Sequence, residues 1–149
     1  MDAKGEELDR ITGFSPPDRF ISTIKPLLAG KSYGALKKKA EKEPDNLEAA
    51  VELGKKEEER QQYAKAEALY KKVLAAKDAS PAIREAAEGR MALLSFMKSR
   101  GRDIAGLHAY FDKKKDTAGV VDHARLLMRA YQDGDEVAKV VSVCEYLIR

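Results

Sequence analysis

The sequence predicts an all-α protein built from antiparallel helix pairs. Ala, Leu, Glu and Lys, which are strong helix formers, dominate the chain of 149 residues. Proline, glycine and short polar clusters divide it into segments of helical length, joined by connections of a few residues. Within these segments apolar residues recur at three- and four-residue spacing, the period of an amphipathic helix. No convincing run of strands interrupts them.

Turn signals place the expected helices of the N-terminal half. Proline favours the first turn of a helix, whereas glycine and the residue before a proline favour its end. We expect helices from Pro16-Pro17 to Gly30, with a kink at Pro26; from about Ser32 to Lys42; from Leu47, capped by Asp45 or Asn46, to a turn formed by the polar run Glu57 to Gln62; and from Tyr63 to Leu74.

The same signals continue through the C-terminal half. We expect a helix from Ser80-Pro81 to about Gly101, one capped by Asp103 that ends before Asp116 to Gly119, and one closed by Asp133-Gly134-Asp135. The last helix is expected to bury one apolar stripe, made of Val137, Val140, Val141, Cys144, Leu147 and Ile148.

Three stretches of the chain share a spacing of small and aromatic residues. In a frame that begins at Leu47, the fourth, seventh and eighth positions are Ala50, Leu53 and Gly54, and the seventeenth, twentieth and twenty-fourth are Tyr63, Ala66 and Tyr70. Frames that begin at Glu88 and Val121 repeat this spacing, although Ser95 and then Met128 replace Gly54.

This pattern resembles the tetratricopeptide repeat (TPR), a helix pair of about 34 residues with Leu-Gly in its first helix. The best match is Leu47 to Leu74, and the resemblance covers residues 47–149, with a degenerate pair at 16–43. It implies that residues 16–149 form one repeat domain, in which the pairs stack as a right-handed superhelix. The alternative is an irregular helical bundle with an accidental period.

The first thirty residues carry a second, looser resemblance. Asp2, Gly5, Arg10, Gly13 and Phe14, followed by a helix, are similar to the last strand and helix of a thioredoxin-like domain. Residues 1–15 would then be a leader left from an upstream domain, and the repeats the docking arm of a redox protein whose catalytic part is absent here. The alternative is an ordinary polar leader, with residues 1–13 disordered or irregular.

The composition offers little for catalysis. The chain has one cysteine and two histidines, no phosphate loop and no zinc-ligand spacing. We therefore expect no enzyme, cofactor or metal, with Cys144 a packed thiol and Glu57 to Arg60 a solvated face. The net charge is +3, and no aromatic residues interleave with the lysine clusters at 37–39, 71–72 and 113–115, so we do not expect nucleic acid as a partner.

A protein or peptide is the expected partner. In TPR arrays the first helices line a concave groove with their second, fifth, ninth, twelfth and thirteenth positions, which here include Val51, Glu58 and Gly89. The residues chosen as partner contacts are Glu48, Lys55, Phe96, Arg100, Arg125 and Arg129. Lys55 replaces the asparagine of the family's carboxylate-clamp subtype, so that specificity is not assigned.

Self-association is a further possibility for the sequence. The last helix would expose its apolar side if no further helix covered it, and a homodimer would then be favoured. No apolar run reaches the roughly 20 residues that span a bilayer, and no signal peptide is seen. We expect no membrane association and, by default, a cytoplasmic location; a periplasmic one fits if the chain is a fragment.

Overall fold

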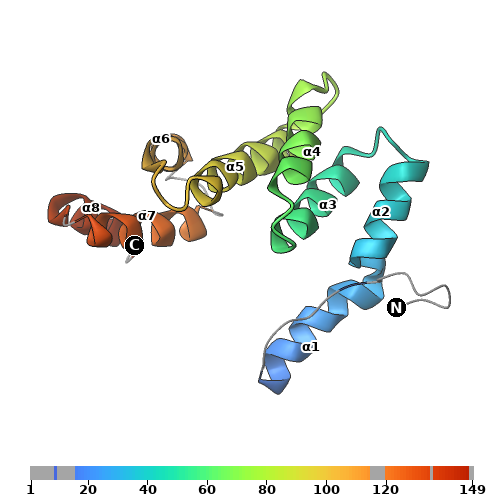
Figure 1. The fold of residues 1–149 in the computed structure, drawn as a ribbon, viewed down its shortest axis with the longest axis horizontal. Helices are drawn as coiled ribbons and strands as arrows, with labels where there is room; N and C mark the ends of the chain where they lie inside the picture. The colour runs from blue at the N-terminus through green and yellow to red at the C-terminus, as the bar shows by residue number, and fades with distance from the viewer. Residues whose placement is uncertain (1–8, 10–15, 115–119, 135, 148–149) are drawn as a thin grey trace. The chain divides into compact units, whose positions relative to one another are not determined.

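The regular elements of the structure, a computed structural model, are all helices (Figure 1). It describes residue 9 and residues 16–114, 120–134 and 136–147; the expectations for the rest of the leader and for the break at residues 116–119 lie outside this part. The helices are α1 (Pro17–Pro26), continued by η1 (Leu27–Lys31), α2 (Tyr33–Lys42), α3 (Leu47–Glu59), α4 (Tyr63–Ala75), α5 (Pro81–Lys98), α6 (Ile104–Lys114), α7 (Val121–Asp133) and α8 (Val137–Leu147). The predicted all-α class is confirmed.

Capping side chains explain where several helices begin. The side chain of Asn46 accepts a hydrogen bond from the backbone N–H of Ala49 at 3.0 Å, which settles the choice between Asp45 and Asn46 as the cap of α3. Ser80 accepts from the N–H of Ile83 at 3.3 Å at the start of α5. These caps lie within one helical turn of their partners, so local sequence was enough to predict them.

The chain divides into two compact units, an N-terminal unit (Met1–Arg84) and a C-terminal unit (Glu85–Arg149). In the N-terminal unit α3 and α4 form an antiparallel hairpin, with Tyr70 fully buried over Gly54. A Cβ atom at Gly54 would lie 2.5 Å from Cε1 of Tyr70, so the ring fits only because residue 54 has no side chain. The Leu47 frame thus has its small and aromatic positions in contact.

Two expectations for the N-terminal unit are wrong. The helix of Glu57 and Glu58 continues to Glu59, and both side chains are buried rather than solvated; the turn is confined to residues 60–62. The kink expected at Pro26 lies instead at Ala29 and Gly30, because helical dihedral angles continue through Pro26 and Leu27. Gly30 has a φ of 80°, a conformation that glycine adopts without strain.

In the C-terminal unit α7 packs against both α6 and α8, and side chains of α5 join the same core. Its buried members are Leu93, Leu107, Phe111, Val120, Ala124, Leu127, Tyr131 and Val143. Gly89 of α5 makes room for the Tyr110 side chain of α6, since a Cβ at residue 89 would lie 2.7 Å from the Tyr110 hydroxyl. Ser95, to which the repeat frame assigned that role, is exposed.

The stripe predicted for α8 also needs correction. The fully buried residue of this helix is Val143, which the stripe omitted. Val137 and Val141 are 68% and 51% exposed, whereas Val140, Cys144 and Leu147 are half-buried. Cys144 packs with its thiol 3.5 Å from the Met128 sulfur. The inward face of α8 is therefore rotated toward Val143, and its apolar residues are divided between core and surface.

Candidate partner-binding surface

The structure distributes the six predicted contact residues over three helices and the end of one of them. Glu48 and Lys55 lie on α3, Phe96 on α5 and Arg100 just beyond it, and Arg125 and Arg129 one turn apart on α7. The predicted groove positions Val51, Glu58 and Gly89 are buried, so they offer no surface to a partner. Among the six, the structure brings Arg125 and Arg129 together on one exposed face.

The predicted residues differ in how available they are. Lys55 pairs with Glu52 at 2.6 Å, and Arg125 lies 3.8 Å from Asp122 in a solvent-exposed pair that is worth little. Glu48, Arg100 and Arg129 are exposed. Phe96 packs partly against the core of the C-terminal unit, so truncating it removes core contacts as well as surface. Arg129 is therefore the cleaner position for testing partner binding.

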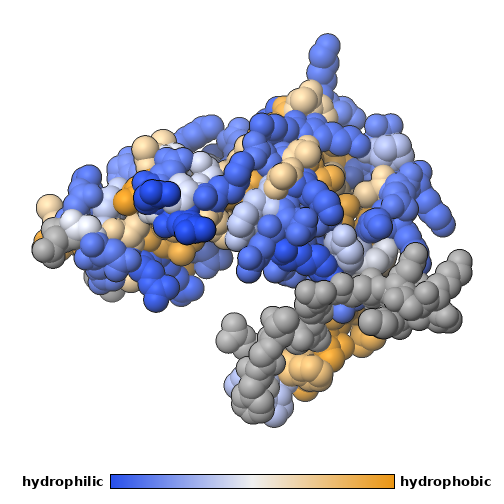
Figure 2. All heavy atoms as spheres, in the orientation of Figure 1, coloured by the Kyte–Doolittle hydropathy of each residue, from blue (hydrophilic) through white to orange (hydrophobic). Residues whose placement is uncertain are grey.

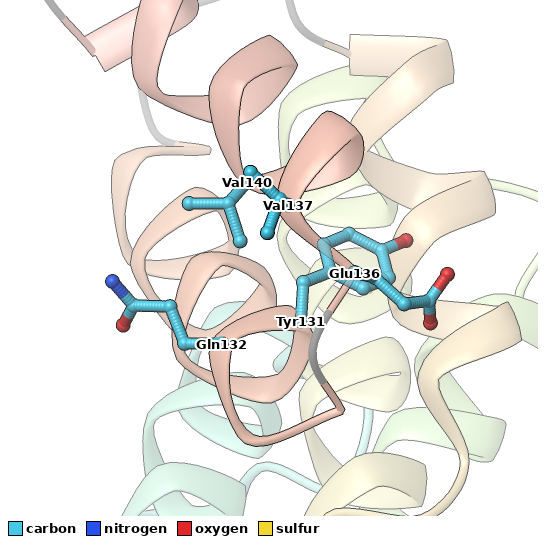
Figure 3. A pocket seen from close by; sticks show the side chains of 5 residues that line it. All are labelled: Tyr131, Gln132, Glu136, Val137 and Val140. Atoms are coloured by element: carbon cyan, nitrogen blue, oxygen red, sulfur yellow. The ribbon is translucent and has the colours of Figure 1, made fainter.

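The turn between α7 and α8 carries an apolar hollow that the sequence did not single out. Its volume is about 180 Å³, and its lining consists of Tyr131, Gln132, Glu136, Val137 and Val140. Figure 3 shows the two valines on α8 and Tyr131 and Gln132 on α7, so the hollow lies where the two helices meet. Most of the lining surface is apolar, which suits an apolar side chain.

A cationic ridge borders this hollow. Arg125, Arg129 and Gln132 follow one another at spacings of four and three residues, so they share one face of α7. Gln132 also lines the hollow, which makes the arginine face and the apolar lining continuous. We call the surface formed by Arg125, Arg129, Gln132, Val137 and Val140 the α7–α8 surface.

A second hollow of about 250 Å³ also has Tyr131 in its lining, together with residues of α6 and of the start of α8. His108 contacts Asp112 at 3.1 Å and meets the Tyr131 ring edge-on. Lys139 lies 5.1 Å from the centroid of that ring and forms an ion pair with Glu136. Burial raises the pKa of Tyr131, and the hydrogen bond to Glu136 raises the pKa of Lys139. Tyr131 stays neutral and Lys139 charged at neutral pH.

The N-terminal unit contains a polar cluster that sequence reasoning missed. The Tyr70 hydroxyl donates to buried Glu58 at 2.6 Å, and the Tyr33 hydroxyl donates to Glu57 at 3.2 Å. Asp9 lies 3.2 Å from Lys56, and Arg60 stacks on the Tyr33 ring. Its members come from residue 9, from α2, α3 and α4, and from the turn after α3, so no local pattern could have indicated it. These groups bond to one another, which is typical of a structural network.

The C-terminal unit buries a histidine. The Nε2–H of His123 donates to the carbonyl oxygen of Gly89 at 3.0 Å, and its ring lies 4.6 Å from that of Tyr110. Within the described residues Nδ1 is buried without a hydrogen-bond partner. Burial lowers the pKa of His123, so the imidazole is neutral. These contacts join α7, which carries His123, to α5 and α6.

Four lysines of the clusters at 71–72 and 113–115 contact other groups of the protein. Lys71 pairs with Glu67 at 2.6 Å, Lys113 with Glu88 at 3.1 Å and Lys114 with Glu85 at 3.0 Å. Lys72 donates to the carbonyl oxygen of Pro44. The ion pairs of Lys113 and Lys114 join α6 to α5, whereas that of Lys71 lies within α4.

Comparison of the chain with known protein families, curated proteins and solved structures finds no match. Within the described residues there is no group of three His, Cys, Asp or Glu side chains that could hold a metal ion. In the same part of the chain, every helix is too short or too polar to cross a bilayer.

Proposed function

We propose that this protein is a TPR-like interaction module that binds a partner peptide on the α7–α8 surface. The observation that carries the proposal is the exposure of Val137, at 68%, beside an apolar-lined hollow. An exposed apolar residue next to a concavity is a common feature of peptide-binding sites. A partner side chain in the hollow would remove Val137 and Val140 from water together.

The charges of this surface define the partner further. Arg125 and Arg129 lie on the face of α7 that meets the hollow at Gln132. A guanidinium group binds carboxylates in bidentate fashion, so acidic residues of the partner would contact this ridge. The proposed ligand is therefore a peptide with one large apolar residue flanked by Asp or Glu.

The remaining predicted contacts extend the same proposal. In a TPR-like right-handed superhelix, the concave face would also present Glu48, Lys55, Phe96 and Arg100 to a long peptide. The close fit of Gly54 and Tyr70 supports a repeat-like helix pair at α3 and α4, because it brings the small and aromatic positions of the repeat together. A crystal structure of the chain with a bound peptide tests whether the longer groove exists.

Selection from a random-peptide display library tests the binding proposal. We expect the selected peptides to carry an apolar residue next to acidic ones. Arg129→Glu and Val137→Asp should each weaken binding of a selected peptide at least tenfold, measured by fluorescence anisotropy, because they reverse the ridge charge and place a charge beside the hollow.

Lys37→Glu is the matched control, since it makes the same kind of charge change at an exposed position on α2. This variant should bind the peptide as the unmodified chain does. Equal affinity of all three variants, or selected peptides without acidic residues, would rule out the α7–α8 surface as the binding site.

A further inference from the structure

The first helix leaves an apolar stripe exposed. Phe20, Ile21 and Leu28 are 44%, 51% and 83% exposed, and Ile24 and Leu27 lie between them on the same face. Figure 2 shows these apolar side chains as an orange patch over α1. Among the described elements, the one that packs substantially against α1 is η1, which continues α1 along the chain. An isolated helix of this length is marginal in water, so a partner for the stripe would stabilise it.

Two opposite charges border this stripe on one edge. Asp18 and Lys25 are seven residues apart, so they lie about 20° from each other around the helix, next to Ile21. Both side chains are exposed. Asp18 lies in the first turn of α1 and Lys25 in the last, so each charge complements the helix dipole. The dipole explains the sign of each charge but not why both lie beside the apolar stripe.

We propose that α1 pairs with α1 of a second copy of this chain, antiparallel and about a two-fold axis near Ile21. In an antiparallel pair, the edge of one helix lies against the same edge of the other helix, and the two edges run in opposite directions. Asp18 of each copy then faces Lys25 of the other, and Phe20 faces Ile24. A parallel pair would instead place the Asp18–Lys25 edge of each helix against the opposite edge of its partner, where neither charge meets its complement, so the charges favour the antiparallel arrangement.

The charge pattern distinguishes a second copy from other occupants of the stripe. A self-complementary edge needs one acid and one base placed symmetrically about the axis, and residues 18 and 25 meet that requirement. The interface is smaller than a standard protein–protein interface, so the dimer is weak and concentration-dependent. A dimer would present two α7–α8 surfaces and so bind a divalent partner with higher avidity, but the pairing itself does not rest on peptide binding.

Sedimentation velocity of the full chain at a series of concentrations tests the pairing. We expect a reversible dimer that weakens with added salt. Asp18→Lys and Lys25→Asp should each raise the dissociation constant about tenfold, because each places like charges opposite one another twice. Lys37→Glu on α2 should leave the constant unchanged, and circular dichroism checks that each variant keeps its helix content.

Mixing the two variants provides the decisive arm. In a heterodimer of Asp18→Lys with Lys25→Asp, both facing pairs are again Lys with Asp. The equimolar mixture should therefore dimerise about as well as the unmodified chain. A chain that is monomeric at every concentration, or a mixture no better than either variant alone, overturns the proposal. Dimerisation that survives both variants but is lost with Val137→Asp overturns it too, and places the contact on α8.

Discussion

Two tyrosine rings lie directly against glycines in this protein, Tyr70 on Gly54 and Tyr110 on Gly89. The first contact could be anticipated, because both residues occupy repeat positions of the Leu47 frame. The second could not, since the Glu88 frame puts Ser95 and Phe111 in those positions. A glycine in a helix signals close approach of something, but the residue that approaches lies on another helix and is fixed only by packing.

Replacing Gly54 with alanine tests how tight the first contact is. Alanine in a helix is favoured over glycine by up to about 1 kcal/mol. Here the new Cβ would lie 2.5 Å from a fully buried ring whose hydroxyl is bonded to Glu58, so the ring cannot move away freely. We expect Gly54→Ala to lower the free energy of unfolding by about 1–3 kcal/mol, measured by urea denaturation.

Gly106→Ala is the matched control for this substitution. Gly106 also lies in a helix, but its Cβ would meet nothing closer than an oxygen of Asp103 at 4.0 Å. Alanine there should raise the free energy of unfolding by roughly 0.5–1 kcal/mol. If both variants are stabilised, Tyr70 has room that the structure does not show.

At the scale of elements, helix ends were easier to predict than helix faces. The start of α3 depends on one side chain and a backbone N–H three residues away, both visible in the sequence. The acidic residues in the last turn of α3 favour a solvated turn on sequence alone. Glu57 and Glu58 are buried there because Tyr33 and Tyr70, from α2 and α4, donate hydrogen bonds to them. Burial of a charged residue depends on such distant partners, which no local pattern contains.

The cap of α3 can be tested against its neighbour. Asn46→Ala removes the acceptor for the Ala49 N–H and should lower the free energy of unfolding by about 1 kcal/mol. Asp45→Ala changes an exposed residue that does not cap the helix, so its effect should stay within about 0.5 kcal/mol. Thermal denaturation of the two variants distinguishes them, and equal losses would show that Asp45 shares the cap.

At the scale of the whole molecule, the sequence predicts one repeat domain over residues 16–149, whereas the structure divides into two compact units between Arg84 and Glu85. Each unit has its own buried residues, with Tyr70 and Val73 in the N-terminal unit and Leu107 and Leu127 in the C-terminal unit. A period in sequence predicts the helix pairs, but the side chains that fill the space between them decide where compact units begin and end.

Acidification should loosen one unit through a single buried group. His123 belongs to the C-terminal unit, and its neutral ring donates to Gly89, stacks on Tyr110 and lies near Arg90 and Asp122. A proton on its buried Nδ1 would find no acceptor among the described residues. Because burial lowers the folded-state pKa below the ordinary 6.5, the unfolded chain takes up the proton first. The contribution of His123 to stability is therefore complete above about pH 6.5 and declines as the pH falls from there toward the lowered folded-state pKa.

Hydrogen exchange tests this expectation. It is measured on the unmodified chain and on His123→Gln, each at pH 7.5 and at pH 5.5. Glutamine keeps a donor for the Gly89 carbonyl but does not titrate. Between the two pH values, amides of α6 and α7 should lose more protection in the unmodified chain than in the variant, while α3 and α4 should behave alike in both proteins. An equal loss in the two proteins would mean that His123 is not the group that responds. A difference extending into α3 and α4 would mean that the two units open together rather than separately.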